Sequence, residues 1–223
     1  MLDKKPVKYP DQIKINEIFY SIQGESTYVG LPTVFVRTSG CNLRCTYCDT
    51  TYAYYEGAFL TLDEVISKIQ SFSTQYVCIT GGEPLLQEGV QQLMIKLCDL
   101  GKLVSLETSG SRDISKVDSR VKIILDVKTP ESGAENSFLD SNLNYLTSTT
   151  EIKFVICSEK DFLWAESFCH QNNLFKKSIV LYSPSYEKVL PRWLAEQILH
   201  HNSTARLHLQ QHKYIWSSTT RGV

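Results

Sequence analysis

Runs rich in β-branched and aromatic residues alternate with runs of helical periodicity along most of this 223-residue chain. Strands that are separated by helices pair in parallel, because the connecting chain crosses one face of the sheet in a right-handed sense. The alternation therefore predicts an α/β fold whose parallel sheet is either open or rolled into part of a barrel. We expect strands at 33–38, 76–79, 103–107, 121–126, 151–157, 178–182 and 205–210, and helices at 62–72, 90–100, 161–172 and 191–200.

Local signals support several of these boundaries. Thr61 and Glu64 have the spacing of a capping box at the start of the first helix, and Pro191 suits the first turn of the last helix. The stretch 129–150 is rich in Ser, Asn, Thr and Gly, which predicts a long surface connection. No internal repeat interrupts the pattern, so we expect residues 1–223 to form a single domain.

Charge and hydrophobicity exclude several classes of partner. The formal net charge is −1 and charged residues make up 21% of the chain, so a broad basic surface for nucleic acid is not expected. No apolar run reaches the roughly 20 residues that span a bilayer, and residues 1–6 show no apolar stretch of signal-peptide type. We therefore expect a cytoplasmic protein that binds neither nucleic acid nor a membrane.

The chain has seven cysteines, an odd and unevenly spaced set, so a disulfide framework is not expected in reducing cytosol. A free cysteine within an apolar run usually acts as a small buried hydrophobic residue. This interpretation applies to Cys78, Cys98, Cys157 and Cys169.

The other three cysteines, Cys41, Cys45 and Cys48, form a CxxxCxxC loop that follows the first predicted strand. A structural zinc site or an ordinary electron-transfer cluster takes four protein ligands. Three thiols on one loop can instead hold three irons of a 4Fe–4S cluster and leave the fourth iron open to a small molecule. A zinc knuckle would need a fourth ligand nearby, yet the next histidine is His170, and a thiol-redox loop has an isolated CxxC. The triplet therefore predicts a catalytic centre.

Polar residues follow several of the other predicted strands, at 80–84, 107–110, 126–128 and 211–213. The C-terminal ends of parallel strands meet on one rim of the sheet, where functional loops gather. In the first of these segments, Gly81 and Gly82 allow backbone groups to approach a ligand closely, and Glu83 offers a carboxylate to an amine. By itself, Gly-Gly-Glu-Pro is typical of a plain turn.

The cysteine triplet, followed at the next strand end by Gly81-Gly82-Glu83, resembles the radical S-adenosylmethionine (SAM) superfamily. The resemblance implies that SAM chelates the open iron through its methionine amino and carboxylate groups, and that the Gly-Gly-Glu segment binds the amino group. One electron from the cluster then cleaves SAM to a 5′-deoxyadenosyl radical that takes hydrogen from the substrate. The residues implied at SAM are Gly81, Gly82, Glu83, Glu107, Ser109, Asp126 and Lys128.

A second resemblance runs essentially from end to end. The segments 15–25, 35–37, 48–50 and 211–216 are similar to the 7-carboxy-7-deazaguanine synthase family. This implies a partial, modified TIM-like barrel of about six parallel strands, of the radical SAM type. It also implies a carbon–nitrogen lyase that converts 6-carboxy-5,6,7,8-tetrahydropterin to 7-carboxy-7-deazaguanine and ammonia, a step toward queuosine. The implied cofactors and partners are SAM, a 4Fe–4S cluster, Mg²⁺, an external one-electron reductant such as flavodoxin, and a second copy in a homodimer.

The same resemblance implies a role for individual residues. The pterin contacts are Ile22, Gln23, Gly24, Glu25, Arg37, Thr80, His212 and, through the C-terminal carboxylate, Val223. Thr50 matches the magnesium ligand, which substrate oxygens and waters would complete. Residues 1–30 are implied as a substrate-side segment, and 205–223 as a strand and tail that close the site. Each role has a structural alternative: an ion pair for Arg37, a cap for Thr50 and an ordinary terminal histidine for His212.

Two other functions match parts of the pattern. A glycyl-radical activase of the same superfamily also carries CxxxCxxC, but it acts on a protein and has no use for the set Gln23, Arg37, Thr50 and His212. A non-enzymatic iron–sulfur carrier would be expected to have a fourth nearby cysteine and no Gly-Gly-Glu segment.

The chain departs from some family members at 126–128, where Asp-Val-Lys replaces Ser-Pro-Lys.

Overall fold

A computed structural model describes residues 11–223 and places all of their strands in one mixed sheet. The strand order is β3-β1-β2-β4-β5-β6-β7-β8-β9, and neighbours from β2 to β9 pair in parallel. The parallel strands are β2 (Pro32–Thr38), β4 (Tyr76–Gly81), β5 (Leu103–Thr108), β6 (Lys122–Asp126), β7 (Glu151–Ile156), β8 (Ile179–Pro184) and β9 (Arg206–Leu207). The sheet does not close, because β3 and β9 form its two edges. The expected open, partial barrel of parallel strands is therefore confirmed.

Two antiparallel strands extend the sheet at its first edge and were not predicted. β1 (Gln12–Ile22) pairs with β2, and β3 (Ala58–Thr61) pairs with β1. Ile13 and Ile15 are buried in the core, but the pairing of β1 shifts register just after Ile15. A bulge of this kind interrupts the two-residue alternation of apolar side chains. The sequence pattern of β1 therefore does not resemble that of one regular strand.

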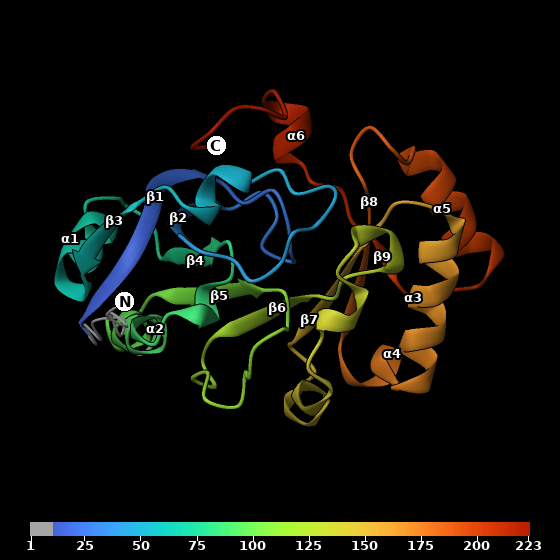
Figure 1. Ribbon diagram of the computed structural model, residues 1–223, viewed down its shortest axis with the longest axis horizontal. Coiled ribbons are helices and arrows are strands. Elements are labelled where there is room, and N and C mark those ends of the chain that lie inside the picture. Colours follow the sequence, from blue (N-terminus) through green and yellow to red (C-terminus); the bar gives the residue numbers. More distant parts are fainter. Residues whose placement is uncertain (1–10) are drawn as a thin grey trace, which may run out of the picture.

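The predicted helices are confirmed with small shifts of their ends. They are α1 (Leu62–Gln70), α2 (Gly89–Asp99), α3 (Glu159–Gln171) and α5 (Pro191–His200), with short α4 (Leu174–Lys177) and α6 (His212–Ile215). The capping box forms as expected: Thr61 Oγ1 accepts from Glu64 N at 3.2 Å, and Glu64 accepts from Thr61 N at 2.7 Å. In Figure 1, α1 and α2 lie beside β1–β5, whereas α3, α4 and α5 lie beside β7–β9.

The connection 129–150 is long and mostly exposed, as its composition predicts, but it is not a plain loop. It contains three 3₁₀ turns, η3 (Pro130–Ser132), η4 (Glu135–Ser137) and η5 (Asp140–Tyr145). Asn142 is fully buried, and its Nδ2 donates to the carbonyls of Gly110 and Arg112, both at 2.9 Å. The segment thus packs against the loop after β5, where no α-helix connects β5 to β6.

Two apolar clusters support the sheet. One joins β1, β2, β4 and β5 to α1 and α2 around residues such as Leu93 and Met94. The other joins β6, β7 and β8 to α3 and α5 around Phe154, Phe162 and Tyr182. Full burial of one such side chain contributes about 1.5–3 kcal/mol, so these clusters hold the strand ends in place.

Three of the cysteines predicted as buried hydrophobic residues are buried and free, namely Cys78, Cys157 and Cys169. Cys98, in α2, is also free but only partly buried.

Among residues 11–223, no helix has both the length and the apolar character needed to cross a membrane.

Candidate active site

A cavity of about 680 Å³ lies at the C-terminal ends of the parallel strands, where the sequence predicts the site. All but one of the predicted site residues line it: Ile22, Gln23, Gly24, Glu25, Arg37, Cys41, Cys45, Cys48, Thr50, Thr80, Gly81, Gly82, Glu107, Ser109, Asp126, Lys128, His212 and Val223. The exception is Glu83. These residues come from many parts of the sequence, so the fold brings together the segments that the two resemblances single out.

The cysteine loop forms one wall of this cavity. Cys41, Cys45 and Cys48 are free and partly buried, and all three line the cavity. Burial raises the pKa of the Cys45 thiol, and the nearby Lys128 opposes that rise. The amide of Thr46 donates to the Ser132 carbonyl at 2.9 Å, which ties the loop to the segment after β6.

The donor set of this wall fits an iron–sulfur cluster better than a single ion. Within residues 11–223, no group of three or more His, Cys, Asp or Glu side chains is spaced around one metal ion. A cubane cluster makes a different demand, because each thiol binds its own iron and the sulfurs stand farther apart. Three free thiols along one cavity wall provide one ligand for each of three irons.

The two glycines after β4 allow two backbone segments to touch. A Cβ on Gly82 would overlap the Gly40 carbonyl oxygen and lie 2.8 Å from Cys41 Cβ, and a Cβ on Gly81 would overlap the backbone of Thr38. The amide of Glu83 donates to the Gly40 carbonyl at 2.8 Å. The Gly-Gly segment is therefore held directly against the start of the cysteine loop.

Glu83 differs from its predicted role at SAM, because its side chain does not reach the cavity. It is fully buried and accepts from Thr108 Oγ1 at 2.8 Å, from Ser109 N at 2.8 Å and from Ser109 Oγ at 2.6 Å. It also caps the turn after β4 by accepting from Leu85 N at 3.1 Å. Glu83 thus joins the end of β4 to the end of β5, and its carboxylate is already engaged there.

A group of buried charges lies on the sheet side of the cavity. Asp126, at the end of β6, forms ion pairs with Lys128 at 2.9 Å and with Lys153 at 3.0 Å. Burial alone would raise the pKa of Asp126, but the two lysines outweigh it and hold that pKa below its usual range. Glu107 accepts from Thr80 Oγ1 at 2.9 Å, and burial, followed by the charge of Glu25, raises its pKa.

The loop after β1 supplies the predicted substrate side. The Nε2 of Gln23 is buried, faces the Cys78 thiol and has no hydrogen-bond partner of normal geometry in the described part of the chain. Glu25 accepts from Lys153 Nζ at 2.6 Å and from Gln210 Nε2 at 2.8 Å. Burial alone would raise the pKa of Glu25, but Lys153, with smaller contributions from the two nearby histidines, holds it well below the usual range.

Close packing of Gly24 brings His212 into the site. A Cβ on Gly24 would overlap the His212 imidazole and lie 2.8 Å from its amide nitrogen. The amide of Gln211 donates to the Gly24 carbonyl at 2.9 Å, so α6 is fixed to the loop after β1. Burial lowers the pKa of His212. His212 is therefore a partly buried residue of the site and not an ordinary, solvent-exposed terminal histidine.

Arg37 projects from β2 into the cavity and is also part of an ion pair. Its Nε donates to Glu17 at 2.7 Å, and the guanidinium lies 5.4 Å from the Phe19 ring centroid. The ion pair expected as the structural alternative is thus present, and Arg37 also lines the cavity. The terminal guanidinium nitrogens are the donors that a substrate carboxylate would use.

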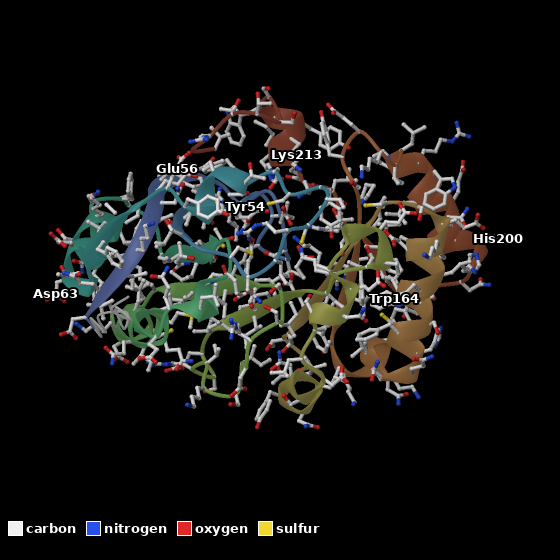
Figure 2. The ribbon with its side chains drawn as sticks, in the orientation of Figure 1. Tyr54, Glu56, Asp63, Trp164, His200 and Lys213 are labelled. Carbon is white, nitrogen blue, oxygen red and sulfur yellow. The ribbon has the colours of Figure 1, made fainter. Side chains whose placement is uncertain are left out.

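Thr50 lines the cavity beside a carboxylate that the sequence did not single out. Its Oγ1 donates to Asp49 Oδ1 at 2.9 Å, and Asp49 Oδ2 pairs with Lys213 Nζ at 2.7 Å. Lys213 lies next to the predicted site residue His212 in α6. Figure 2 labels Lys213 and Tyr54 near the upper middle of the molecule, above the sheet, whereas Asp63 and His200 lie at its two ends.

The C-terminal segment covers the cavity from the same side. Residues 218–221 and Val223 line it, and Arg221 stacks 3.7 Å from the Tyr52 ring centroid and pairs with Glu56 at 3.1 Å. Figure 1 shows α6 and the chain end above the first strands and the segment after β2. The last predicted strand is much shorter than 205–210, because the chain leaves the sheet after Leu207 and turns toward the cavity.

Several cavity residues were not singled out individually from the sequence, chiefly Tyr47, Asp49, Lys153, Gln210 and Lys213. The hydroxyl of Tyr47 is buried and has no hydrogen-bond partner in the part of the chain that the structure describes. The Nζ of Lys128 lies 5.6 Å from the centroid of the Tyr47 ring. Such an orphaned polar atom fits a ligand in the cavity. For Lys153 a signal did exist, because it stands among apolar residues of a predicted strand, and a lysine is rarely buried without a partner.

Comparison with known proteins gives a consistent result. Residues 35–130 match the model of the radical SAM superfamily. A protein named 7-carboxy-7-deazaguanine synthase from Chlorobaculum tepidum is 42% identical over 214 residues, which cover 95% of this chain and 97% of the relative. Another with that name, from Koribacter versatilis, is 42% identical over 226 residues, covering 95% of this chain and 100% of the relative.

The fold of a solved structure also matches. The crystal structure of QueE from Escherichia coli superposes with a TM-score of 0.72 at 22% identity, over 89% of this chain and 93% of that chain. At that identity the likeness concerns the fold, whereas the sequence relatives share two fifths of their residues along nearly the whole chain. This chain therefore belongs to the 7-carboxy-7-deazaguanine synthase family of the radical SAM superfamily.

Proposed function

We propose that this protein converts 6-carboxy-5,6,7,8-tetrahydropterin to 7-carboxy-7-deazaguanine with release of ammonia, in a radical SAM reaction that Mg²⁺ assists. The observation that carries the proposal is a single cavity lined by the three thiols, the Gly-Gly segment, and the set Gln23, Arg37, Thr50 and His212. Its volume of about 680 Å³ suits small molecules. A glycyl-radical activase, which would admit a polypeptide, is not favoured by such a site.

The thiols of Cys41, Cys45 and Cys48 would hold the cluster, and the Gly81–Gly82 backbone and Tyr47 would hold SAM beside it. Together these cofactors supply the one-electron chemistry that makes and quenches a carbon radical. The chain itself places the ligands and excludes water. Gly82 sets the approach of the two segments, because nothing larger than hydrogen fits between it and Gly40.

On the other side of the cavity, the residues after β1 would hold the pterin. Glu25 stays ionised and can accept from the pterin amino and ring N–H groups, while Gln23 brings a buried amide donor without a partner. The fork of Arg37 suits the substrate carboxylate. His212 has a lowered pKa, so at neutral pH its imidazole is uncharged and can accept or donate one hydrogen bond.

The proposal is tested by reconstituting the cluster anaerobically and supplying SAM, a reductant, Mg²⁺ and carboxytetrahydropterin. The expected products are 7-carboxy-7-deazaguanine and ammonia, detected by mass spectrometry and an ammonia assay. Cleavage of SAM without formation of the deazapurine would contradict the substrate assignment and leave the superfamily intact.

Replacing Arg37 by alanine should raise the KM for the carboxylated pterin about 30- to 150-fold, because a charge-assisted hydrogen bond of about 2–3 kcal/mol is lost. Steady-state kinetics measure this change. A pterin that lacks the carboxylate serves as the control, since its KM should be the same with wild type and R37A. An equal loss for both pterins would mean that Arg37 acts only through its ion pair with Glu17.

Replacing Thr50 by alanine should raise the Mg²⁺ concentration for half-maximal stimulation about tenfold or more, because one oxygen ligand is removed. Titration of activity with MgCl₂ measures this shift. Thr51→Ala is the matched control, since Thr51 is the exposed neighbour and does not line the cavity. If Mg²⁺ stimulates T50A and T51A equally, Thr50 is not a ligand.

We further propose that the working enzyme is a cytoplasmic homodimer that receives its electron from an external reductant such as flavodoxin. The family relationship supports this, and light scattering on the purified protein measures the oligomeric state.

Within the single domain 1–223, residues 11–30 and 205–223 would form the substrate side and the closing tail. Residues 1–10 of the N-terminal segment lie outside the described residues.

A further inference from the structure

Lys153 is a buried lysine in the middle of a strand whose other residues are all buried. It lies in β7 and is paired in register with Asp126 of β6. Its side chain is only 7% exposed, yet it lines the cavity. A buried ammonium group is costly unless it is paired and hydrogen-bonded, so the partners of Lys153 indicate what it does.

Its two partners come from opposite sides of the cavity. Lys153 Nζ lies 2.6 Å from Glu25 Oε2, on the substrate side, and 3.0 Å from Asp126 Oδ2, on the SAM side. The other oxygen of each carboxylate has its own partner, Gln210 for Glu25 and Lys128 for Asp126. Lys153 is thus the group that directly connects the two carboxylates.

Several other charged groups face Glu25, and they do not replace Lys153. They are His208 and His212 near the C-terminus, Glu107 in β5, Asp49 after the last cysteine of the loop, and Asp126 in β6, which shares Lys153 with Glu25. Burial lowers the pKa of both histidines below its usual value, so the positive charge with which they favour ionised Glu25 in acid is largely lost at neutral pH. The other three are carboxyl groups, which oppose a negative charge on Glu25. Lys153 is therefore the neighbour that keeps the Glu25 carboxylate ionised.

We propose that Lys153 is a positioning residue that fixes the Glu25 carboxylate, as an anion and in one orientation, to accept hydrogen bonds from the pterin. This rests on the proposed function, in which Glu25 binds the pterin amino and ring N–H groups. Lys153 acts through Glu25 and needs no contact with the substrate.

The consequence of losing Lys153 follows from the burial of Glu25. Without the lysine, burial raises the Glu25 pKa, and below that pKa the carboxyl group carries a proton. A protonated carboxyl then presents an O–H to the N–H groups of the pterin, and binding is weak. As the pH rises through the new pKa, the carboxylate returns and binding recovers.

The test measures binding of 6-carboxypterin, the aromatic analogue of the proposed substrate, by its fluorescence at pH values from about 6 to 9. Lys153→Met keeps most of the aliphatic side chain but removes the charge. We expect K153M to bind about tenfold or more weakly than wild type near pH 6.5, with the difference shrinking as the pH rises. Lys153→Arg, which keeps a charge, should restore most of the affinity and remove the added pH dependence.

Lys122→Met is the matched control. Lys122 is a nearly buried lysine on the neighbouring strand, where its Nζ pairs with Glu151 at 3.0 Å, and it does not line the cavity. Thermal unfolding of both variants separates lost stability from lost binding. We expect K122M to lower the melting temperature without changing the pH profile of binding.

A double-mutant comparison keeps the proposal testable if K153M fails to fold. In a Glu25→Gln background the carboxylate is absent, so adding K153M should cause no further loss of affinity. The proposal would be overturned by any of three results. These are a further loss of affinity when K153M is added to E25Q, an unchanged pH profile of binding in folded K153M, and the same altered profile in K122M. If wild type itself does not bind 6-carboxypterin, the proposed function fails and this proposal fails with it.

Discussion

Cys45→Ala should leave the protein without a stable cluster and should reduce SAM cleavage by about a thousandfold or more. Cys41, Cys45 and Cys48 line one wall of the cavity, and removing one thiol leaves one iron without a protein ligand. After anaerobic reconstitution, the iron content is expected to fall from about four per chain toward zero. Iron and sulfide analysis and the visible absorption spectrum measure this directly, without any assay of activity.

The control for this prediction is Cys98→Ala. Cys98 is also free and partly accessible, but it lies in α2 and does not line the cavity. This variant should bind iron and cleave SAM as wild type does. A C45A protein that still holds a full cluster would show that the loop is not the ligand set, and the radical chemistry would then need another centre.

Gly82→Ala should lower kcat/KM for the proposed reaction about a hundredfold, although it adds a single methyl group. The new Cβ would overlap the Gly40 carbonyl oxygen and crowd Cys41 Cβ at 2.8 Å. Both neighbours belong to backbone that carries the cluster loop, so the loop must shift, and a shift of about 1 Å at a reacting centre can cost about a hundredfold. Steady-state kinetics and the SAM cleavage rate measure the effect.

Gly101→Ala provides the comparison for this glycine. Gly101 has a φ of +76° and open space around the position of a Cβ, so alanine there introduces backbone strain without a collision. Strain of that kind costs about 1–2 kcal/mol of stability and should leave kcat/KM unchanged. If G82A retained wild-type kinetics, the close contact between the Gly-Gly segment and the cysteine loop would have no catalytic importance.

The parallel part of the fold was accessible from the sequence because its strands and helices depend on local periodicity. The helix 191–200 begins and ends where its proline and apolar spacing predict. β1 was missed because a register shift after Ile15 breaks its alternation, and β3 because four exposed or half-exposed residues form an edge strand. The strand predicted at 205–210 was too long, since only its first residues find a partner in β8.

The candidate site was accessible to the extent that its residues fall in compact motifs. Cys41–Cys48 and Gly81–Gly82 are recognisable by spacing, and their presence at one cavity follows from the parallel sheet. Glu83 shows the limit of such reasoning. Its position in the motif predicts a ligand contact, but Thr108 and Ser109 at the end of the next strand already occupy its carboxylate.

The sequence by itself determined the succession of parallel strands and helices from β2 onward, the thiol spacing and the family, because each of these leaves a pattern along the chain. Only the tertiary structure decided which charges share the cavity. Lys153 and Glu25 are 128 residues apart in sequence and meet because β7 pairs with β6 in a register that points Lys153 toward the loop after β1. Such a contact depends on which strands become neighbours in the sheet and in which register, and the residues around Lys153 or around Glu25 do not specify this by themselves.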